Sequence, residues 1–277
     1  VNDMPIDVKC PVLQRMTDMI AHRGPDSEGH YIDEHAALGH RRLSIIDLGG
    51  GQQPIYNEDG SKVITFNGEI YNYQTLREEL IAAGHTFTTK SDTEVLLHGY
   101  EQWGVDLLQR VRGMFTFVIW DKNKQELFGA RDHFGIKPFY YAKMNGTFMY
   151  ASEIKSLLRH PDFVKELNAE ALKPYMTFQY PAIGETFFKG VYKLPEGHYF
   201  TYRDGKMDIH RYYDEDFREG KQKLGELVNS IDQTVCDSVK AHQIADVEVG
   251  SFLSSGVDSS YVAAVARPQH TYSIGFG

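Results

Sequence analysis

Short runs of β-branched and aromatic residues, separated by Gly, Asn and Asp, fill residues 1–213 and constrain the fold more than any other feature. They predict strands at 62–72, 114–121, 126–132, 138–142 and 148–152. Apolar residues at helical spacing predict helices at 11–20, 75–83 and 92–102. Many strands with few helices predict an α+β domain with layered sheets.

The composition changes after residue 213. Residues 210–223 are polar and charged, which predicts a linker. Apolar residues then recur at steps of three and four, which predicts an amphipathic helix: Leu224, Leu227, Ile231, Val235 and Val239. A strand at 247–253, a loop, a second helix and a strand at 271–276 follow, the start of a parallel sheet. We therefore expect two domains, at 1–213 and 214–277.

The loop of this second domain has the chemistry of a phosphate site. The sequence FLSSGVDSSYVAAVA (252–266) leads from an apolar strand through a Ser/Gly turn into a helix, whose N-terminal N–H groups attract anions. It lacks the Gly-Lys-[Ser/Thr] ending of a Walker A loop. Gly256 lets the backbone approach a ligand, and Asp258 is placed to hold Mg²⁺ beside a polyphosphate. The alternative is a plain turn between strand and helix.

Charge and composition exclude other classes of function. The formal net charge is −9 and Lys and Arg do not cluster, which argues against a nucleic-acid partner. No apolar run approaches the roughly 20 residues of a membrane span. The opening residues lack the pattern of a secretory signal, and Cys10 and Cys236 are too few for a disulfide framework. We expect a soluble cytoplasmic protein.

Three stretches of the first domain carry polar residues in unusual places. HRRLSIIDL (40–48) places Arg42 beside a short apolar strand, and KSDTEVLL (90–97) places Asp92 at a helix N-cap. FNGEIYN (66–72) puts Asn67 and Gly68, both poor strand formers, inside a strand. Each has a simpler explanation: a solvated arginine, a cap and a hairpin turn.

Taken together with AHRGPDSEG (21–29), ARDHFGIKPFYY (130–141) and ASEIKSL (151–157), these stretches resemble the glutaminase domain of class II amidotransferases. More narrowly, they resemble the glutamine-hydrolysing asparagine synthetases. The 253–259 loop is similar to the Ser-Gly-Gly-x-Asp-Ser pyrophosphate loop of ATP pyrophosphatases, with Ser255 where that family usually has Gly. The resemblance implies a layered αββα sandwich of antiparallel sheets, followed by the start of an α/β parallel-sheet ATP-pyrophosphatase domain.

The resemblance also implies a glutamine site. The nucleophile of such enzymes is an N-terminal cysteine with a free α-amine, expected just before Val1; Cys10 has neither that amine nor a following glycine. Arg42 suits the substrate carboxylate and Asp92 its ammonium. The Asn67 amide and the Gly68 N–H would form the oxyanion hole. The rest of the pocket is expected from Glu69, Leu43, Ile45 and Ile46.

In the second domain the resemblance implies ATP with Mg²⁺ and aspartate as ligands. Leu253 would contact the adenine side, and the phosphates would lie against Ser254, Gly256, Asp258 and Ser259. Ammonia from glutamine would pass through a dry tunnel, with Met114 a candidate wall, to an aspartyl-adenylate. A homodimer is expected from the family alone.

Three alternatives remain at this stage. One is a related amidotransferase that amidates another carboxylate, in a secondary metabolite or a surface polysaccharide. Another is a β-lactam-synthetase-like protein with an inactive glutaminase, disfavoured because Arg42, Asn67, Gly68 and Asp92 are all present. The third is a non-catalytic glutamine-binding module.

Overall fold

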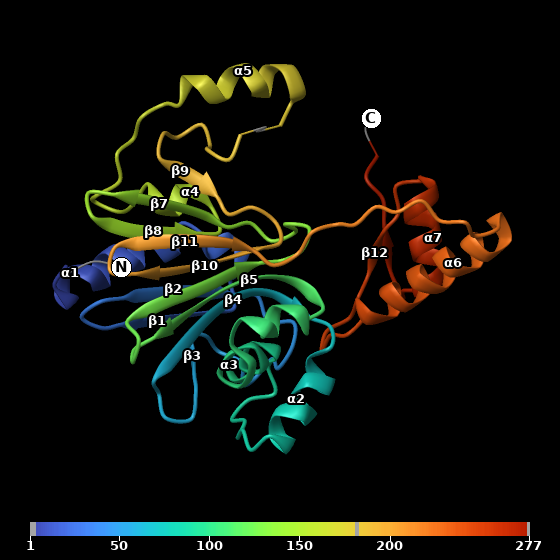
Figure 1. Cartoon of the computed structure of the whole chain (residues 1–277), viewed down its shortest axis with the longest axis horizontal. Coiled ribbons are helices and arrows are strands. Elements are labelled where there is room, and N and C mark those ends of the chain that lie inside the picture. The colour runs from blue at the N-terminus through green and yellow to red at the C-terminus, as the bar shows by residue number, and fades with distance from the viewer. Residues whose placement is uncertain (1–3, 181–182, 276–277) are drawn as a thin grey trace. The chain divides into compact units, whose positions relative to one another are not determined.

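The computed structural model describes residues 4–180 and 183–275 (Figure 1). The chain divides into two compact units: unit 1 comprises Val1–Ser44 and Gly49–Asp214, and unit 2 comprises Ile45–Leu48 and Glu215–Gly277. The helices of unit 1, two of them 3₁₀ helices (η), are α1 (Ile6–Asp18), η1 (Ala21–Arg23), α2 (Tyr73–Ala82), α3 (Asp92–Trp103), η2 (Gly104–Gln109), α4 (Ile154–Leu157) and α5 (Ala169–Phe178).

In the described part of unit 1 the strands form three antiparallel sheets. The largest has the order β11 (Lys206–Arg211), β10 (His198–Arg203), β6 (Glu126–Arg131), β5 (Gly113–Asp121), β4 (Lys62–Ile70) and β3 (Ile55–Tyr56). The second pairs β1 (Ser27–Ile32) with β2 (Ala37–Arg42). The third has the order β8 (Thr147–Ala151), β7 (Tyr140–Met144) and β9 (Val191–Lys193).

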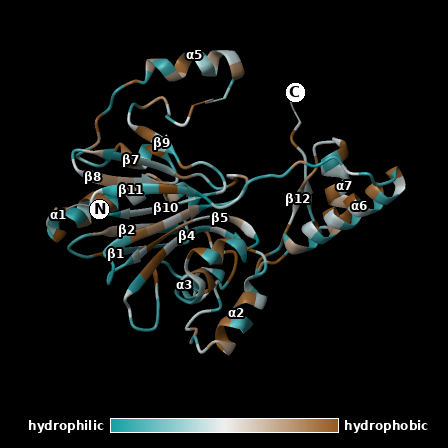
Figure 2. Cartoon of the chain, in the orientation of Figure 1, coloured by the Kyte–Doolittle hydropathy of each residue, from teal (hydrophilic) through white to brown (hydrophobic). Residues whose placement is uncertain are grey.

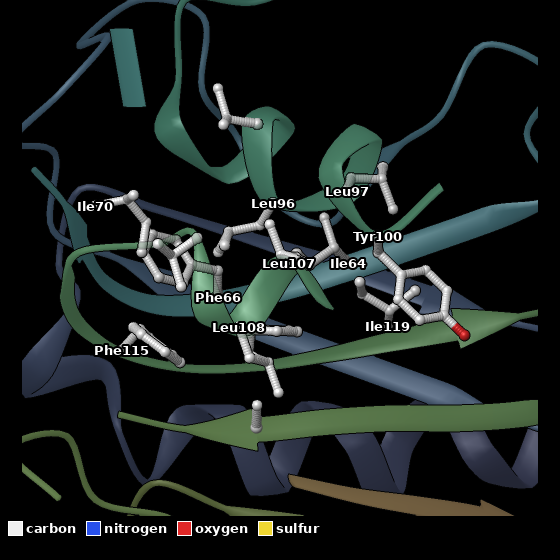
Figure 3. Packing of buried hydrophobic residues seen from close by; sticks show 14 of the residues in the cluster. Ile64, Phe66, Ile70, Leu96, Leu97, Tyr100, Leu107, Leu108, Phe115 and Ile119 are labelled. Atoms are coloured by element: carbon white, nitrogen blue, oxygen red, sulfur yellow. The ribbon is translucent and has the colours of Figure 1, made fainter. Parts of the chain in front are cut away.

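Alternating side chains of β5 explain the layers. Phe115, Phe117 and Ile119 join the cluster under α2, α3 and η2, and Figure 3 shows Leu96 and Leu107 over this face of the sheet. Val118 and Trp120 point to the opposite face, against side chains from β1, β2, β7 and β8. Residues of α1 and α4 pack on the β8-β7-β9 sheet. The six-stranded sheet is one layer, and the β1-β2 and β8-β7-β9 sheets together form the second. The order helix, sheet, sheet, helix confirms the predicted αββα sandwich.

Unit 2 contains α6 (Leu224–Ala241), β12 (Ser251–Phe252), α7 (Val257–Ala266) and β13 (Thr271–Tyr272). β12 and β13 are parallel, as predicted. The predicted strands at 247–253 and 271–276 are too long, because only two residues of each pair within the described residues; Phe276 lies outside them. Figure 2 shows hydrophobic and hydrophilic residues along α6, and Leu224 and Ile231 are exposed.

Two further features bear on the expectations from sequence. The predicted linker 210–223 overlaps the end of β11, and residues 212–223 have no regular structure.

No helix among the described residues is both long and apolar enough to cross a bilayer.

Candidate functional site

One edge of β4 is only partly covered by a neighbouring strand. On this edge β3 pairs with Val63 and Ile64 and then ends, whereas β5 pairs with the whole length of the other edge. Beyond β3 the side chain of Gln53 binds one peptide of β4. Phe66 N–H donates to Gln53 Oε1 (2.6 Å), and Gln53 Nε2 donates to the Phe66 carbonyl (3.0 Å).

A second side chain binds the same edge of β4 four residues after Phe66, at Ile70. Asp92 Oδ2 accepts a hydrogen bond from Ile70 N–H at 3.0 Å. In a strand, the N–H groups of alternate residues point to the same edge. Gly68 therefore presents its N–H on this edge, between the Phe66 peptide and the Asp92 carboxylate. A Cβ at Gly68 would lie 2.1 Å from the Met114 carbonyl oxygen, so the position admits no side chain.

Asn67 lies in the strand interior, as predicted, and the structure pairs it with Thr116 of β5. Its Nδ2 is buried and has no hydrogen-bond partner within the described residues. A buried N–H donor without a partner costs about 1–3 kcal/mol of stability, which is offset only if something accepts from it. The Asn67 amide is therefore a donor ready for a ligand oxygen.

Asp92 is the first residue of α3 and not its N-cap, so that prediction is wrong. Ser91 is the cap: its Oγ accepts from Thr93 N–H at 3.2 Å. The Asp92 carboxylate is consequently free to reach across to β4. Burial raises the pKa of Asp92 to about 6, and the nearby charge of Glu69 acts in the same direction.

Arg42 is the last residue of β2, and the short apolar strand predicted beside it in the 40–48 stretch does not form after Arg42. Residues of the HRGPD stretch (22–26) bind the backbone after Arg42, where the chain leaves the strand. Asp26 N–H donates to the Arg42 carbonyl (3.0 Å), and Asp26 Oδ2 accepts from Ser44 N–H (2.8 Å). Gly24 packs directly on this backbone, where a Cβ would lie 2.3 Å from the Arg41 carbonyl carbon.

The buried Arg42 guanidinium lies beside the start of α3. A Cβ built on Gly51 would be 2.7 Å from Arg42 Nη2 and 3.1 Å from Ser91 Cβ. The cation is thus brought to the N-terminus of the helix that begins with Asp92. A guanidinium and a carboxylate in one site complement the carboxylate and ammonium of a free amino acid.

Other predicted pocket residues are placed differently. The Leu43 side chain is 56% exposed. Ile45 and Ile46 belong to unit 2, where the Ile45 carbonyl accepts from Asp246 N–H at 2.9 Å. Glu69 lies on β4, half-buried. Cys10 lies on α1, exposed.

Two site residues were missed by the sequence analysis. Gln53 has no recognisable pattern around it in GGGQQP. His40 of β2 hydrogen-bonds through Nε2 to the Phe66 carbonyl (2.9 Å), so Nε2 carries the proton; Nδ1 is buried without a partner in the described part of the chain. Burial lowers the pKa of His40 to about 4, and the imidazole is neutral near pH 7.

The ARDHFG stretch builds a support behind Gly68. The fully buried Arg131 guanidinium donates to the carbonyls of Lys137 (2.8 Å), Leu194 (2.7 Å) and Gly135 (2.5 Å). The Asp132 carboxylate accepts from four backbone N–H groups, those of Phe115, Phe134, Ile136 and Lys137, at 2.9–3.2 Å. Phe115 is the β5 partner of Gly68. The loop therefore fixes the strand against which Gly68 packs.

In unit 2 the predicted nucleotide residues lie on one turn. Leu253, half-buried, donates its N–H to the Tyr272 carbonyl (2.8 Å), and Ser254 N–H donates to Ser259 Oγ (3.3 Å). Gly256 is the N-cap of α7, and Asp258 is exposed in its first turn. A Cβ on Gly256 would meet no atom closer than 3.7 Å. This open helix N-terminus fits a phosphate, with Asp258 as one carboxylate for a cation that phosphate oxygens also bind.

Ser255 adopts a left-handed conformation in this turn, with φ of 63°. A non-glycine residue there carries a backbone cost of roughly 1–2 kcal/mol. Ser255 in place of glycine therefore strains the loop backbone but leaves the N-terminus of α7 open.

Two families of known proteins match parts of this chain. Residues 4–213 match the family described as Glutamine amidotransferase domain, and residues 230–277 match that described as Asparagine synthase. Glutamine-hydrolyzing asparagine synthetase 1 of Bacillus subtilis (strain 168) is 46% identical over 96% of this chain and 43% of its own length. Asparagine synthetase 3 of the same organism is 37% identical over 95% of this chain and 45% of its own.

Amidase chry2 of Gibberella zeae is 36% identical over 91% of this chain and 38% of its own length. The chain spans less than half the length of each of these three relatives. The first family covers most of the chain, including every residue gathered at the edge of β4. The chain therefore belongs to the family of glutamine amidotransferase domains.

Proposed function

We propose that the protein to which these residues belong is a glutamine-hydrolysing asparagine synthetase. Unit 1 hydrolyses glutamine to glutamate and ammonia, and ammonia is passed to an aspartate that ATP has activated. The glutaminase domain ends near residue 213 and the synthetase domain follows it. The identity of the relatives over nearly the whole chain supports this function.

The glutaminase step rests on one observation, the unpartnered Asn67 donor beside the Gly68 N–H. We assign Arg42 to the glutamine carboxylate and Asp92 to its ammonium, with Glu69 on the same strand completing the pocket. A thiolate of a cysteine preceding Val1 attacks the side-chain amide. The negative charge that develops on the amide oxygen is then stabilised by Asn67 Nδ2 and Gly68 N–H.

The synthetase step is assigned to the turn of unit 2. When bound with Mg²⁺, ATP supplies the adenylyl group that activates the aspartate carboxylate. The phosphates would be held by Ser254, Gly256, Asp258 and Ser259, with Leu253 on the adenine side. Binding here draws on the α7 N-terminus, which alone contributes about 0.3–1 kcal/mol when exposed.

The overall reaction is tested by isotope transfer. We expect full-length protein supplied with amide-¹⁵N glutamine, aspartate, ATP and Mg²⁺ to form ¹⁵N-asparagine, detected by mass spectrometry. Ammonia release with no labelled asparagine would refute the acceptor and favour an amidotransferase for another carboxylate. Absence of glutamine hydrolysis would refute the glutaminase assignment.

The raised pKa of Asp92 predicts how glutamine binding depends on pH. A carboxyl with a pKa of about 6 becomes protonated at a higher pH than ordinary aspartate does, and it then loses its attraction for an ammonium. We expect the KM for glutamine to be constant above pH 7 and to rise about tenfold per pH unit below pH 6. Asp92→Asn should have a high KM that no longer changes over this range. A wild-type KM that stays flat from pH 5 to 7 would contradict the assignment.

A further inference from the structure

Four side chains that commonly bind metals lie together on the part of α3 that follows Asp92 and on two neighbouring loops. His98 and Glu101 are one turn apart on α3, His85 follows α2, and Glu58 lies between β3 and β4. Their ligand atoms all lie within 4.8 Å of one another. These four residues are called the His/Glu cluster below. None of them takes part in the glutamine site described above.

Three distances between ligand atoms in the cluster are close to those of a tetrahedral zinc site. Zn²⁺ binds His nitrogen and carboxylate oxygen at about 2.0–2.2 Å, which places neighbouring ligands of a tetrahedron about 3.3–3.6 Å apart. His98 Nδ1 lies 3.0 Å from Glu101 Oε2 and 3.4 Å from Glu58 Oε2. His85 Nδ1 lies 3.4 Å from Glu58 Oε1. Small changes in the distances between these ligand atoms would let them coordinate the ion.

Each imidazole ring has an oxygen on its far side, within hydrogen-bond distance only for His85. His85 Nε2 lies 3.2 Å from Gln102 Oε1, and His98 Nε2 lies 3.5 Å from Glu94 Oε1. At His85 the acceptor behind Nε2 keeps the proton there and turns the Nδ1 lone pair toward the cluster; His98 Nε2 is buried without a hydrogen-bond partner in the described part of the chain. Acceptors of this kind orient metal-binding histidines in many proteins.

Neighbouring side chains also orient the Glu101 carboxylate, here as hydrogen-bond and charge donors to one of its oxygens. Its Oε1 accepts from Asn57 Nδ2 (2.6 Å) and lies 3.4 Å from Lys62 Nζ. Oε2 is the oxygen left to face His98. The second oxygen is therefore directed into the cluster by its neighbours.

Charge and access suit a divalent cation. The carboxylates of Glu58, Glu94 and Glu101 with the ammonium of Lys62 leave two negative charges. Against the effect of burial, the neighbouring glutamates raise the pKa of His98 to about 9, so without metal its imidazolium offsets one of them. Zn²⁺ with a neutral His98 would balance both. His98 is fully buried, whereas the Glu58 side chain is 38% exposed. Glu58 therefore brings the cluster to the protein surface, and the buried imidazole provides a fixed ligand.

We propose that the His/Glu cluster binds one structural Zn²⁺ through Glu58, His85, His98 and Glu101. All four positions of the tetrahedron are filled by protein, which is the arrangement of structural zinc and not of catalytic zinc. The ion would tie the β3–β4 turn and the loop after α2 to α3. On binding, Zn²⁺ takes the place of the proton that bridges His98 Nδ1 and Glu101, and that proton is released to solvent.

The test uses the chain stripped of metal with chelator and titrated with ZnCl₂ in a calorimeter. We expect one Zn²⁺ per chain and a higher thermal unfolding midpoint when zinc is present. His85→Gln and Glu58→Gln, both at partly exposed positions, should each weaken zinc binding on the order of 100-fold. His270→Gln removes an exposed histidine that pairs with one glutamate in unit 2, and it should bind zinc like the wild type.

Circular dichroism of each variant without metal separates loss of the site from loss of the fold. Co²⁺ in place of Zn²⁺ should give the visible absorption of a four-coordinate ion in the wild type and lose it in His85→Gln. No zinc binding, or equal binding by the wild type and both cluster variants, would overturn the proposal. The cluster would then be only an ion-pair network around His98.

Discussion

Replacing Asn67 by alanine should lower the kcat of the full-length protein for glutamine hydrolysis about 100- to 1,000-fold, with little change in KM. The reason lies in the partner that Asn67 Nδ2 lacks. This buried donor has no acceptor within the described residues, so it is held ready for charge that appears only in the transition state. Steady-state kinetics across a range of glutamine concentrations separate the two parameters.

Asn123→Ala is the matched control, because Asn123 lies in the turn between β5 and β6 and, among the residues the structure describes, contributes only its backbone N–H, to Asp121. It should leave both kinetic parameters within a factor of two or so, as surface substitutions usually do. A rise in KM at constant kcat in Asn67→Ala would mean that the amide binds the ground state instead. It would also remove Asn67 from the oxyanion hole.

Replacing Asp132 by alanine should destabilise the folded chain by about 3–5 kcal/mol. The carboxylate is 1% exposed and accepts from four backbone N–H groups, which alanine would leave without an acceptor. It also lies next to the buried Arg131 guanidinium, whose charge it helps to balance. Urea unfolding followed by circular dichroism measures the loss.

Asp208→Ala is the control for that experiment, because Asp208 on β11 is solvent-accessible and pairs with Lys206 at the surface. Its effect should stay within about 0.5 kcal/mol. A loss below about 1 kcal/mol in Asp132→Ala would show that water replaces the carboxylate in the loop. Asp132 would then have no special role in fixing the strand behind Gly68.

The sequence predicts well the elements that have a strong repeating pattern. β4, β5 and β6 follow from runs of β-branched and aromatic residues, and α2, α3 and α6 follow from helical spacing. Position 67 in the strand interior could also be predicted, because the apolar pattern continues on both sides of the Asn–Gly pair. In each case the local sequence alone determines the pattern.

What sequence could not predict depends on distant partners. The chain leaves β2 at Arg42 because Asp26 binds the backbone on both sides of that turn, and no feature of residues 43–46 indicates this. Ser91 and Asp92 are both good caps, and only the contact with Ile70 shows that Asp92 reaches across to β4. Gln53 acts on a strand through its side chain, for which no sequence pattern exists.

The Gln53 contact has a consequence for how the sheet meets other molecules. An uncovered strand edge invites pairing with other chains, and proteins usually protect it with another strand or with charged residues. A full strand along β4 would also have covered the Gly68 N–H. One glutamine side chain protects the edge over the length of a single residue, too little to block a small molecule. The edge therefore stays closed to polypeptides and open to an amino acid.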